Sequence, residues 1–255
     1  MAKIIAVANQ KGGVGKTTTN VNLSACIAEA GKRVLAIDID PQGNTTSGLG
    51  IDKRSLQKTV YDVLINGEDI SNCIIDTCVK GLDLLPATMR LAGAEIELVS
   101  TLAREHVLKN ALKHVRRHYD YIFIDCPPSL GLLTINALTC ADTLLVPIQC
   151  EFYALEGLSE LMNTVKLIRK ALNPSLGVEG VVLTMFDSRT NLSNQVVDEV
   201  KKFFKNKVYK TVIPRNVRLG EAPSFGLPIT LYDPKCIGAL AYTDLAGELL
   251  GEEER

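Results

Sequence analysis

The stretch Lys-Gly-Gly-Val-Gly-Lys-Thr-Thr at residues 11–18 decides the fold of this 255-residue chain. It follows an apolar run at 3–8 that predicts a strand, and it leads into a predicted helix at 17–30. A strand, a glycine-rich turn and a helix in this order form a phosphate-binding loop, because glycines let successive backbone N–H groups turn towards phosphate oxygens. The amino terminus of the helix adds partial positive charge.

Individual residues of this loop have separate expected roles. Lys16 can reach the β- and γ-phosphates of a nucleotide, and the Thr17 hydroxyl can bind Mg²⁺. Gln10 replaces the usual first glycine of such loops, and a second lysine, Lys11, enters the loop. One lysine suffices for a nucleotide in its own subunit, so Lys11 suggests a charge aimed at a facing subunit. The residues predicted to bind the nucleotide here are Lys11, Gly12, Gly13, Val14, Gly15, Lys16, Thr17 and Thr18.

Composition and charge are those of an ordinary globular domain, with 46% hydrophobic and 22% charged residues. No apolar run approaches the ~18 residues needed to span a bilayer. The amino terminus lacks the layout of a signal peptide. The seven cysteines are odd in number and scattered, which favours free thiols in a reducing compartment. We therefore expect one cytoplasmic domain covering residues 1–255.

Predicted strands and helices alternate along the chain. Strands are expected at 33–39, 82–85, 121–125, 143–148, 178–185 and 208–213, and further helices at 101–118, 155–172, 191–204 and 237–250. The strand at 121–125 is apolar without alternation, which is typical of strands covered on both faces. The sequence therefore predicts the α/β class. We expect a three-layer, mostly parallel sheet of the P-loop NTPase type, with helices on both faces.

Carboxylates stand at the ends of two more predicted strands. Ligands of open α/β sheets bind beyond the carboxyl ends of the strands, so these groups are expected beside the phosphate loop. Asp125 ends an apolar run in the Walker B arrangement and is predicted to hold Mg²⁺ through water. Asp38 is predicted to join the same metal shell, and Asp40 to orient an attacking water. Strand alternation predicts that Asp38 and Asp40 share one face.

A basic segment covers residues 189–218. It contains eight lysines and arginines against two acidic residues, a net charge of +6, while the rest of the chain carries −7. A local basic stripe is typical of surfaces that bind nucleic-acid phosphates. The alternative is a solvated helix face, and composition alone does not separate the two.

At this point the chain resembles the ParA/Soj chromosome- and plasmid-partitioning ATPases of the deviant Walker A, MinD-like group. The resemblance runs nearly end to end. Besides the loop at 11–18, it rests on Asp-Ile-Asp-Pro-Gln-Gly-Asn at 38–44 and Ile-Asp-Cys-Pro-Pro-Ser-Leu at 124–130. It continues through Gln-Cys-Glu-Phe-Tyr-Ala-Leu-Glu-Gly-Leu at 149–158 and Ile-Pro-Arg-Asn-Val-Arg-Leu at 213–219.

The resemblance implies an ATPase that uses ATP and Mg²⁺, with Lys11, Lys16 and Asp40 as catalytic residues. Lys11 matches the family's signature lysine, which reaches across a sandwich dimer to the partner's nucleotide. Gly12 matches the position where the two backbones approach too closely for a side chain. Asp40 matches the aspartate that orients water, and the residues matching the adenine contacts are Pro214 and Asn216.

The resemblance also implies partners. In this family ATP drives homodimerisation, and the dimer binds double-stranded DNA without sequence preference. A centromere-binding ParB-type partner then stimulates hydrolysis and releases the dimer. Arg189 matches a DNA-binding arginine of the family, and Arg218 is expected to assist it. A cytoplasmic, nucleoid-associated protein is implied. Because the chain starts at its first strand, the amino-terminal helix-turn-helix domain of many plasmid relatives is not expected.

Three other functions share the fold. A MinD-like membrane ATPase that positions the division site would end in a basic amphipathic helix, whereas this chain ends in acidic residues at 252–254. An iron–sulfur ATPase would need a second cysteine to match Cys126, and a core thiol is the better interpretation of that residue. A small ATP-dependent ligase of the dethiobiotin synthetase kind would have no use for Lys11 or the basic segment.

Overall fold

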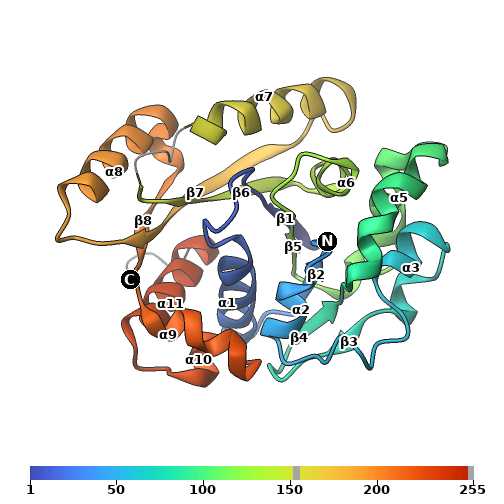
Figure 1. Ribbon diagram of the computed structural model, residues 1–255, viewed down its shortest axis with the longest axis horizontal. Helices are drawn as coiled ribbons and strands as arrows, with labels where there is room; N and C mark the ends of the chain where they lie inside the picture. Colours follow the sequence, from blue (N-terminus) through green and yellow to red (C-terminus); the bar gives the residue numbers. More distant parts are fainter. Residues whose placement is uncertain (152–155, 252–255) are drawn as a thin grey trace.

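A computed structural model describes residues 1–151 and 156–251 of the chain. The predicted motif residues at 152–155 and the acidic tail at 252–255 lie outside the described residues. The centre is an eight-stranded sheet of order β3-β4-β2-β5-β1-β6-β7-β8 (Figure 1). All neighbouring strands are parallel except β3 and β4. The strands are β1 Lys3–Val7, β2 Val34–Asp38, β3 Ile75–Asp76, β4 Leu82–Leu85, β5 Tyr121–Asp125, β6 Thr143–Gln149, β7 Gly177–Phe186 and β8 Val208–Pro214.

Helices cover both faces of this sheet, as Figure 1 shows. One layer contains α3 Val60–Ile65, α4 Ala94–Glu97, α5 Val107–Leu112, α6 Leu132–Cys140, α7 Glu156–Ala171 and α8 Asn191–Phe204. The other contains α1 Lys16–Glu29, α2 Asn44–Gly48, α9 Val217–Glu221, α10 Ile229–Tyr232 and α11 Ile237–Leu250. The predicted three-layer, mostly parallel α/β class is confirmed.

Each face of the sheet has its own hydrophobic core. Along β1, Ile4 and Ala6 belong to the core under α6 and α7, whereas Ile5 and Val7 belong to the core under α1 and α11. This alternation follows from the two-residue period of a strand. With both faces apolar and covered, β1 is held in the middle of the sheet. Its carboxyl end therefore lies between the ends of its neighbours.

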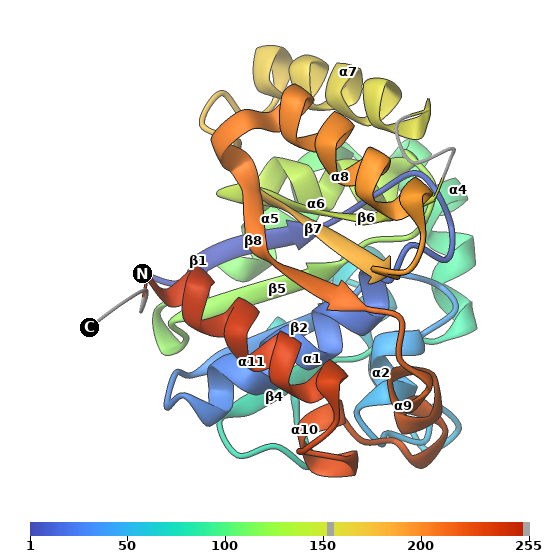
Figure 2. The same cartoon turned by 90° about the vertical axis from the view of Figure 1, so that its left-hand side faces the viewer.

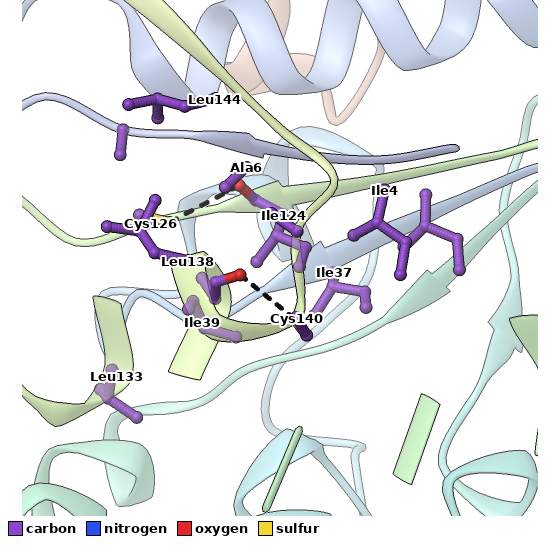
Figure 3. Packing of buried hydrophobic residues seen from close by; sticks show 14 of the residues in the cluster. Ile4, Ala6, Ile37, Ile39, Ile124, Cys126, Leu133, Leu138, Cys140 and Leu144 are labelled. Carbon is purple, nitrogen blue, oxygen red and sulfur yellow. Dashed lines mark hydrogen bonds between the residues drawn. The ribbon is translucent and has the colours of Figure 1, made fainter. Parts of the chain in front are cut away.

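Cys126 belongs to the first of these cores. Figure 3 shows it among Ile124, Leu138 and Leu144, with its Sγ donating a hydrogen bond to the Ile124 carbonyl at 3.8 Å. Cys126 is completely buried. The interpretation of Cys126 as a core thiol is confirmed.

Most predicted elements appear within one or two residues of their expected bounds, but the helix predicted at 101–118 is wrong. Ala103 adopts a left-handed φ of 53°, and only the short α5 is α-helical in this range. Helix α5 starts only at Val107, and the Leu108 amide in its first turn donates to Asn136 of α6 at 3.2 Å. Arg116 pairs with Asp142 at 2.5 Å, which pulls the end of the segment towards the sheet. Helix α6 itself was not predicted.

Candidate functional site: a phosphate loop beside buried carboxylates

The glycine-rich loop follows β1, on either side of which the sheet is built from connections that run in opposite directions. From β1 the chain crosses to β2 on one side, and β6 lies on the other, so the loop sits at a topological switch point (Figure 2). Gly13 and Gly15 have left-handed φ values of 73° and 88°, which favour glycine. Gly12 is exposed and has no such φ. No heavy atom of the described chain beyond its neighbours lies within 4 Å of where a Gly12 Cβ would be.

Two polar side chains that were not predicted hold the loop in place. Asn9 donates from Nδ2 to the Pro147 carbonyl of β6 at 2.7 Å and accepts from the Lys11 amide at 3.0 Å. Thr184 of β7 donates from its hydroxyl to the Val14 carbonyl at 2.8 Å. The position of Asn9 directly before the loop is a sequence signal for its role, whereas Thr184 is more than 160 residues away. Contacts with β6 and β7 therefore hold the loop in position.

Lys16 is the buried cation of the site. It is 6% exposed, and its Nζ donates to the Lys11 carbonyl at 3.0 Å. Burial lowers the pKa of Lys16, and the nearby carboxylates of Asp125 and Asp40 act in the opposite direction. The structure thus brings together the predicted Lys16, Asp40 and Asp125. The backbone carbonyl of Lys11 holds the Lys16 side chain, and Lys11 itself is half-buried.

Two carboxylates face each other at the ends of adjacent strands. Asp38 of β2 is in register with Asp125 of β5, and both residues are completely buried. Burial raises the pKa of Asp38, and burial together with the charge of Asp38 raises the pKa of Asp125. The nearby hydroxyls of Thr17 and Thr45 lower the pKa of Asp125 in part. Ionisation of both carboxyl groups therefore needs a compensating positive charge next to the predicted metal-binding hydroxyl.

The donor set fits a magnesium ion. Asp125 Oδ1 is buried and has no hydrogen-bond partner among the described residues. Mg²⁺ prefers hard oxygen ligands and keeps several waters, binding proteins through one or two carboxylates together with substrate phosphates. Thr17, Asp38 and Asp125 supply oxygens of this kind beside the loop. These are the three residues predicted for the metal.

Asp40 lies beyond the strand that was expected to carry it. Strand β2 ends at Asp38, so the prediction that strand alternation sets the direction of Asp40 is wrong. The Asp40 amide instead donates to Asp38 Oδ1 at 3.2 Å, and Asp40 Oδ1 accepts from the Gln42 amide at 2.9 Å. A local turn, and not strand geometry, keeps this largely buried carboxylate at the site.

Helix α2 supplies two threonines that the sequence analysis missed. Thr45 donates from its hydroxyl to Asp125 Oδ2 at 2.8 Å. Thr46 donates from both its amide and its hydroxyl to Asp38 Oδ2, each at 2.8 Å. The pair follows directly after the predicted 38–44 motif, which is the only local signal for it. These contacts tie the segment after Asp40 to both buried carboxylates.

A cavity of about 190 Å³ opens beside the loop. It brings the predicted Pro214 and Asn216 next to Gly15 and Thr18, although β8 and β1 are far apart in sequence. Asn216 also begins α9, since its Oδ1 accepts from the Arg218 amide at 2.8 Å. The residues that line the cavity are Gly15, Thr18, Thr184, Met185, Ile213, Pro214, Arg215, Asn216, Leu219, Gly220 and Tyr242. The cavity suits a flat apolar group attached to phosphates in the loop.

The predicted basic stripe is divided in the structure. Arg189 pairs with Asp187 at 2.7 Å and Arg218 with Glu221 at 2.8 Å, and both acids lie just outside residues 189–218. The net charge of +6 therefore overstates the local positive charge. The lysines at 201–207 lie at the other end of α8, a 14-residue helix about 20 Å long. The lysines therefore lie about one helix length away from Arg189.

Comparison with known proteins places the chain in a family. A family model described as an AAA domain matches residues 2–178. The sporulation initiation inhibitor protein Soj of Bacillus subtilis is 65% identical over 249 residues, covering 98% of each chain. The chain belongs to the Soj/ParA family. The chromosome partitioning protein ParA of Myxococcus xanthus is 53% identical over 250 residues, which are 98% of this Soj/ParA chain and 88% of that protein.

Solved structures of other proteins share the fold of this Soj/ParA chain. Cobyrinic acid a,c-diamide synthase from Mycobacterium smegmatis, with bound ADP and magnesium, is 39% identical with a TM-score of 0.87, covering 100% of this chain and 97% of that one. The cell division ATPase MinD of Pyrococcus furiosus is 26% identical with a TM-score of 0.79, covering 100% of both chains. The prediction of ATP and Mg²⁺ agrees with the ligands of the first structure. No helix in the described part of the chain has the length and apolar character needed to cross a membrane.

Proposed function

We propose that this Soj/ParA protein is an ATP-dependent switch for chromosome partitioning. Its ATP-bound homodimer holds double-stranded DNA without sequence preference, and a ParB-type partner stimulates the hydrolysis that releases it. The observation that carries this proposal is the buried cluster of Lys16, Asp38 and Asp125 directly beside an exposed Gly12. The relatives named Soj and ParA support the partitioning role.

ATP is the proposed nucleotide, with its phosphates in the loop and its adenine in the cavity beside Pro214 and Asn216. Lys16 neutralises phosphate charge in surroundings where water is largely excluded, which strengthens the attraction. Thr17 would hold Mg²⁺ directly, and Asp38 and Asp125 would hold it through water. When bound, Mg²⁺ neutralises charge on the phosphate oxygens. Asp40 orients the attacking water from the rim of the site.

The dimer is proposed from the contrast between Gly12 and its neighbours. Gly13 and Gly15 need to be glycine for conformational reasons, but Gly12 has neither a left-handed φ nor a close neighbour among the described residues of its own chain. A side chain at this position would therefore fit within one protomer. The backbone of a facing protomer close to Gly12 would explain why this position is glycine. Lys11, next to Gly12 in the sequence, would then reach the partner's nucleotide.

DNA binding is proposed for the surface that carries Arg189 and Arg218. Both guanidinium groups are largely exposed, Asp187 is half-buried and the Glu221 side chain is partly exposed, and ion pairs of such solvent-exposed cations contribute little energy. A DNA phosphate can therefore replace the carboxylate at small cost. Dimerisation doubles the number of such contacts, and each one adds to affinity and to its salt dependence. Such a protein would reside on the nucleoid in the cytoplasm.

Filter binding to two unrelated DNA duplexes tests the proposal. The protein is assayed with ATP, with ADP and without nucleotide, at two salt concentrations, with Asp40→Ala included to maintain the ATP state. We expect both duplexes to bind equally, only with ATP, and to dissociate at the higher salt concentration. DNA binding that is independent of the nucleotide, or that persists at the higher salt concentration, would contradict the proposed function.

Two alternatives are tested in parallel. For a MinD-like membrane ATPase, flotation of the protein with anionic vesicles and ATP would be expected; the 26% identity to MinD favours this less than the 65% identity to Soj. For a small-molecule ligase, ATP turnover would depend on a carboxylic acid acceptor and not on DNA. The partner is tested by adding a ParB-type protein, which should raise the rate of ATP hydrolysis.

A further inference from the structure

A close backbone contact joins two segments that meet beside the site. Gly50 follows α2, and Gly226 follows the 3-10 turn Ala222–Phe225. Their φ values are +82° and +65°. A Cβ on Gly226 would lie 2.6 Å from the Gly50 Cα, and a Cβ on Gly50 would lie 2.9 Å from the Gly226 carbonyl oxygen. These separations exclude a side chain at either position, so the contact requires both glycines.

The first segment follows the turn within residues 38–44, which contains Asp40 and is called the catalytic loop below. Between Asp40 and Gly50 lies α2, whose Thr45 and Thr46 bind the carboxylates of Asp125 and Asp38. The Gly50 amide donates to the carbonyl of Ser47 in α2 at 3.0 Å. A displacement of Gly50 is therefore transmitted through one short helix to the carboxylates and to the loop that precedes it.

The second segment carries a wall of the base cavity. Asn216, Leu219 and Gly220 line the cavity, and the same segment continues through α9 and the 3-10 turn to Gly226. The Ile229 amide just beyond it donates at 2.7 Å to Asn22 of α1, the helix that begins with Lys16. This segment therefore reaches from the cavity wall to the contact with Gly50.

We propose that the Gly50–Gly226 contact couples the base cavity to the catalytic loop, so that a base in the cavity holds Asp40 in position for hydrolysis. This inference rests on the proposed ATPase function and deepens it. Gly50 and Gly226 are positioning residues, since neither lines the cavity. An interaction of this kind converts binding energy of the base into turnover, and its loss lowers kcat more than it lowers affinity.

Glycine-to-alanine variants test the coupling. Gly226→Ala adds a Cβ at the contact, and Gly67→Ala is the matched control, because Gly67 has a φ of +68° and no described heavy atom within 4 Å of its Cβ position. Gly226→Ala should lower kcat about tenfold or more while changing the Kd for a fluorescent ATP analogue less than about threefold. Gly67→Ala should leave both values near those of the unsubstituted protein. The kcat of the double variant Gly50→Ala/Gly226→Ala should be no lower than that of the single variants, because each substitution breaks the same contact.

A wild-type kcat in Gly226→Ala, or an equal loss in Gly67→Ala, would overturn the coupling. If Gly226→Ala does not fold, hydrogen exchange of the unsubstituted protein decides the question. Saturating ADP should then protect the amides of residues 44–51 more strongly than saturating pyrophosphate, which fills the loop without a base. Equal protection by both would overturn the proposal. Absence of ATP hydrolysis in the unsubstituted protein would instead contradict the proposed function.

Discussion

The charged groups beyond β1, β2 and β5 differ in kind from those beyond β7 and β8. Lys16, Asp38 and Asp125 are buried, and Asp125 keeps an oxygen without a partner among the described residues. Arg189 and Arg218 are exposed, and each already has a carboxylate partner. Buried charge is costly without a ligand, whereas an exposed pair gains or loses little. Substitutions should therefore have large effects at the first group and modest effects at the second.

The largest effect is expected for Lys16→Ala. Removing the buried cation should weaken ATP binding about 100-fold or more, since charge-assisted hydrogen bonds in a water-poor site are among the strongest. Titration with a fluorescent ATP analogue measures the affinity. Lys53→Ala is the matched control, because half-buried Lys53 also donates to a loop carbonyl, that of Gln42 at 2.8 Å, but through a solvent-exposed hydrogen bond. Equal losses in the two variants would remove the distinction between the buried lysine and the half-buried one.

Asp40→Ala should separate hydrolysis from binding. We expect kcat to fall by about 100-fold, because the water loses its orienting carboxylate, while the affinity for ATP stays close to that of the unsubstituted protein. Steady-state phosphate release measures the first value and the fluorescent analogue the second. Asp52→Ala, at an exposed carboxylate beyond α2, should change neither. Rapid turnover by Asp40→Ala would exclude Asp40 from this role.

Gly12→Val tests the reason for the exposed glycine. A Cβ at this position meets no described residue of its own protomer within 4 Å, so the melting temperature and ATP binding should remain as they are. The ATP-dependent dimer should be lost, as measured by light scattering in the Asp40→Ala background. A variant that dimerises normally would show that no backbone approaches Gly12 closely.

Arg189→Ala tests the exposed surface against a closely matched pair. Arg189 binds Asp187 through its amide, Nε and Nη2, and Arg54 binds Asp52 through the same three groups. Replacing Arg189 should reduce DNA affinity about tenfold, the effect of removing a phosphate contact from each subunit of a dimer. Arg54→Ala should leave DNA affinity unchanged. ATPase activity without DNA should be the same in both variants, and equal DNA binding by both would move the DNA site elsewhere.

The smallest effect, and one of opposite sign, is expected for the stability of Asp125→Asn without ligand. Burial raises the pKa of Asp125 in the folded protein, so its favourable contribution is lost as the pH rises through that raised value. At pH 8 the amide removes a buried charge and should raise the melting temperature by about 2–4 °C, with a smaller gain at pH 5. Differential scanning fluorimetry at the two pH values measures this. A lower melting temperature of Asp125→Asn at pH 8 would mean that neighbouring groups already stabilise the buried charge of Asp125.

How far the sequence predicts this site depends on how local each signal is. The loop at 11–18 and the strand-end carboxylates were predicted, and the structure brings Lys16, Asp40 and Asp125 together. Thr45, Thr46 and Thr184 were missed, because a threonine carries no local mark of the carboxylate or carbonyl that it meets. The helix predicted at 101–118 was wrong for the same reason, since this segment contacts Asn136 and Asp142, which lie outside it and leave no mark in its own apolar pattern.

The sequence by itself determined the α/β class, the phosphate loop and the order of the strands along the chain. These follow from the spacing of apolar residues and glycines over short stretches, which backbone geometry translates directly into strands, turns and helices. Only the tertiary structure decided that Asp38 and Asp125 face each other, that Asp187 neutralises Arg189, and that Gly50 touches Gly226. Such contacts depend on strand order and on close packing between distant segments, neither of which is written in a local pattern.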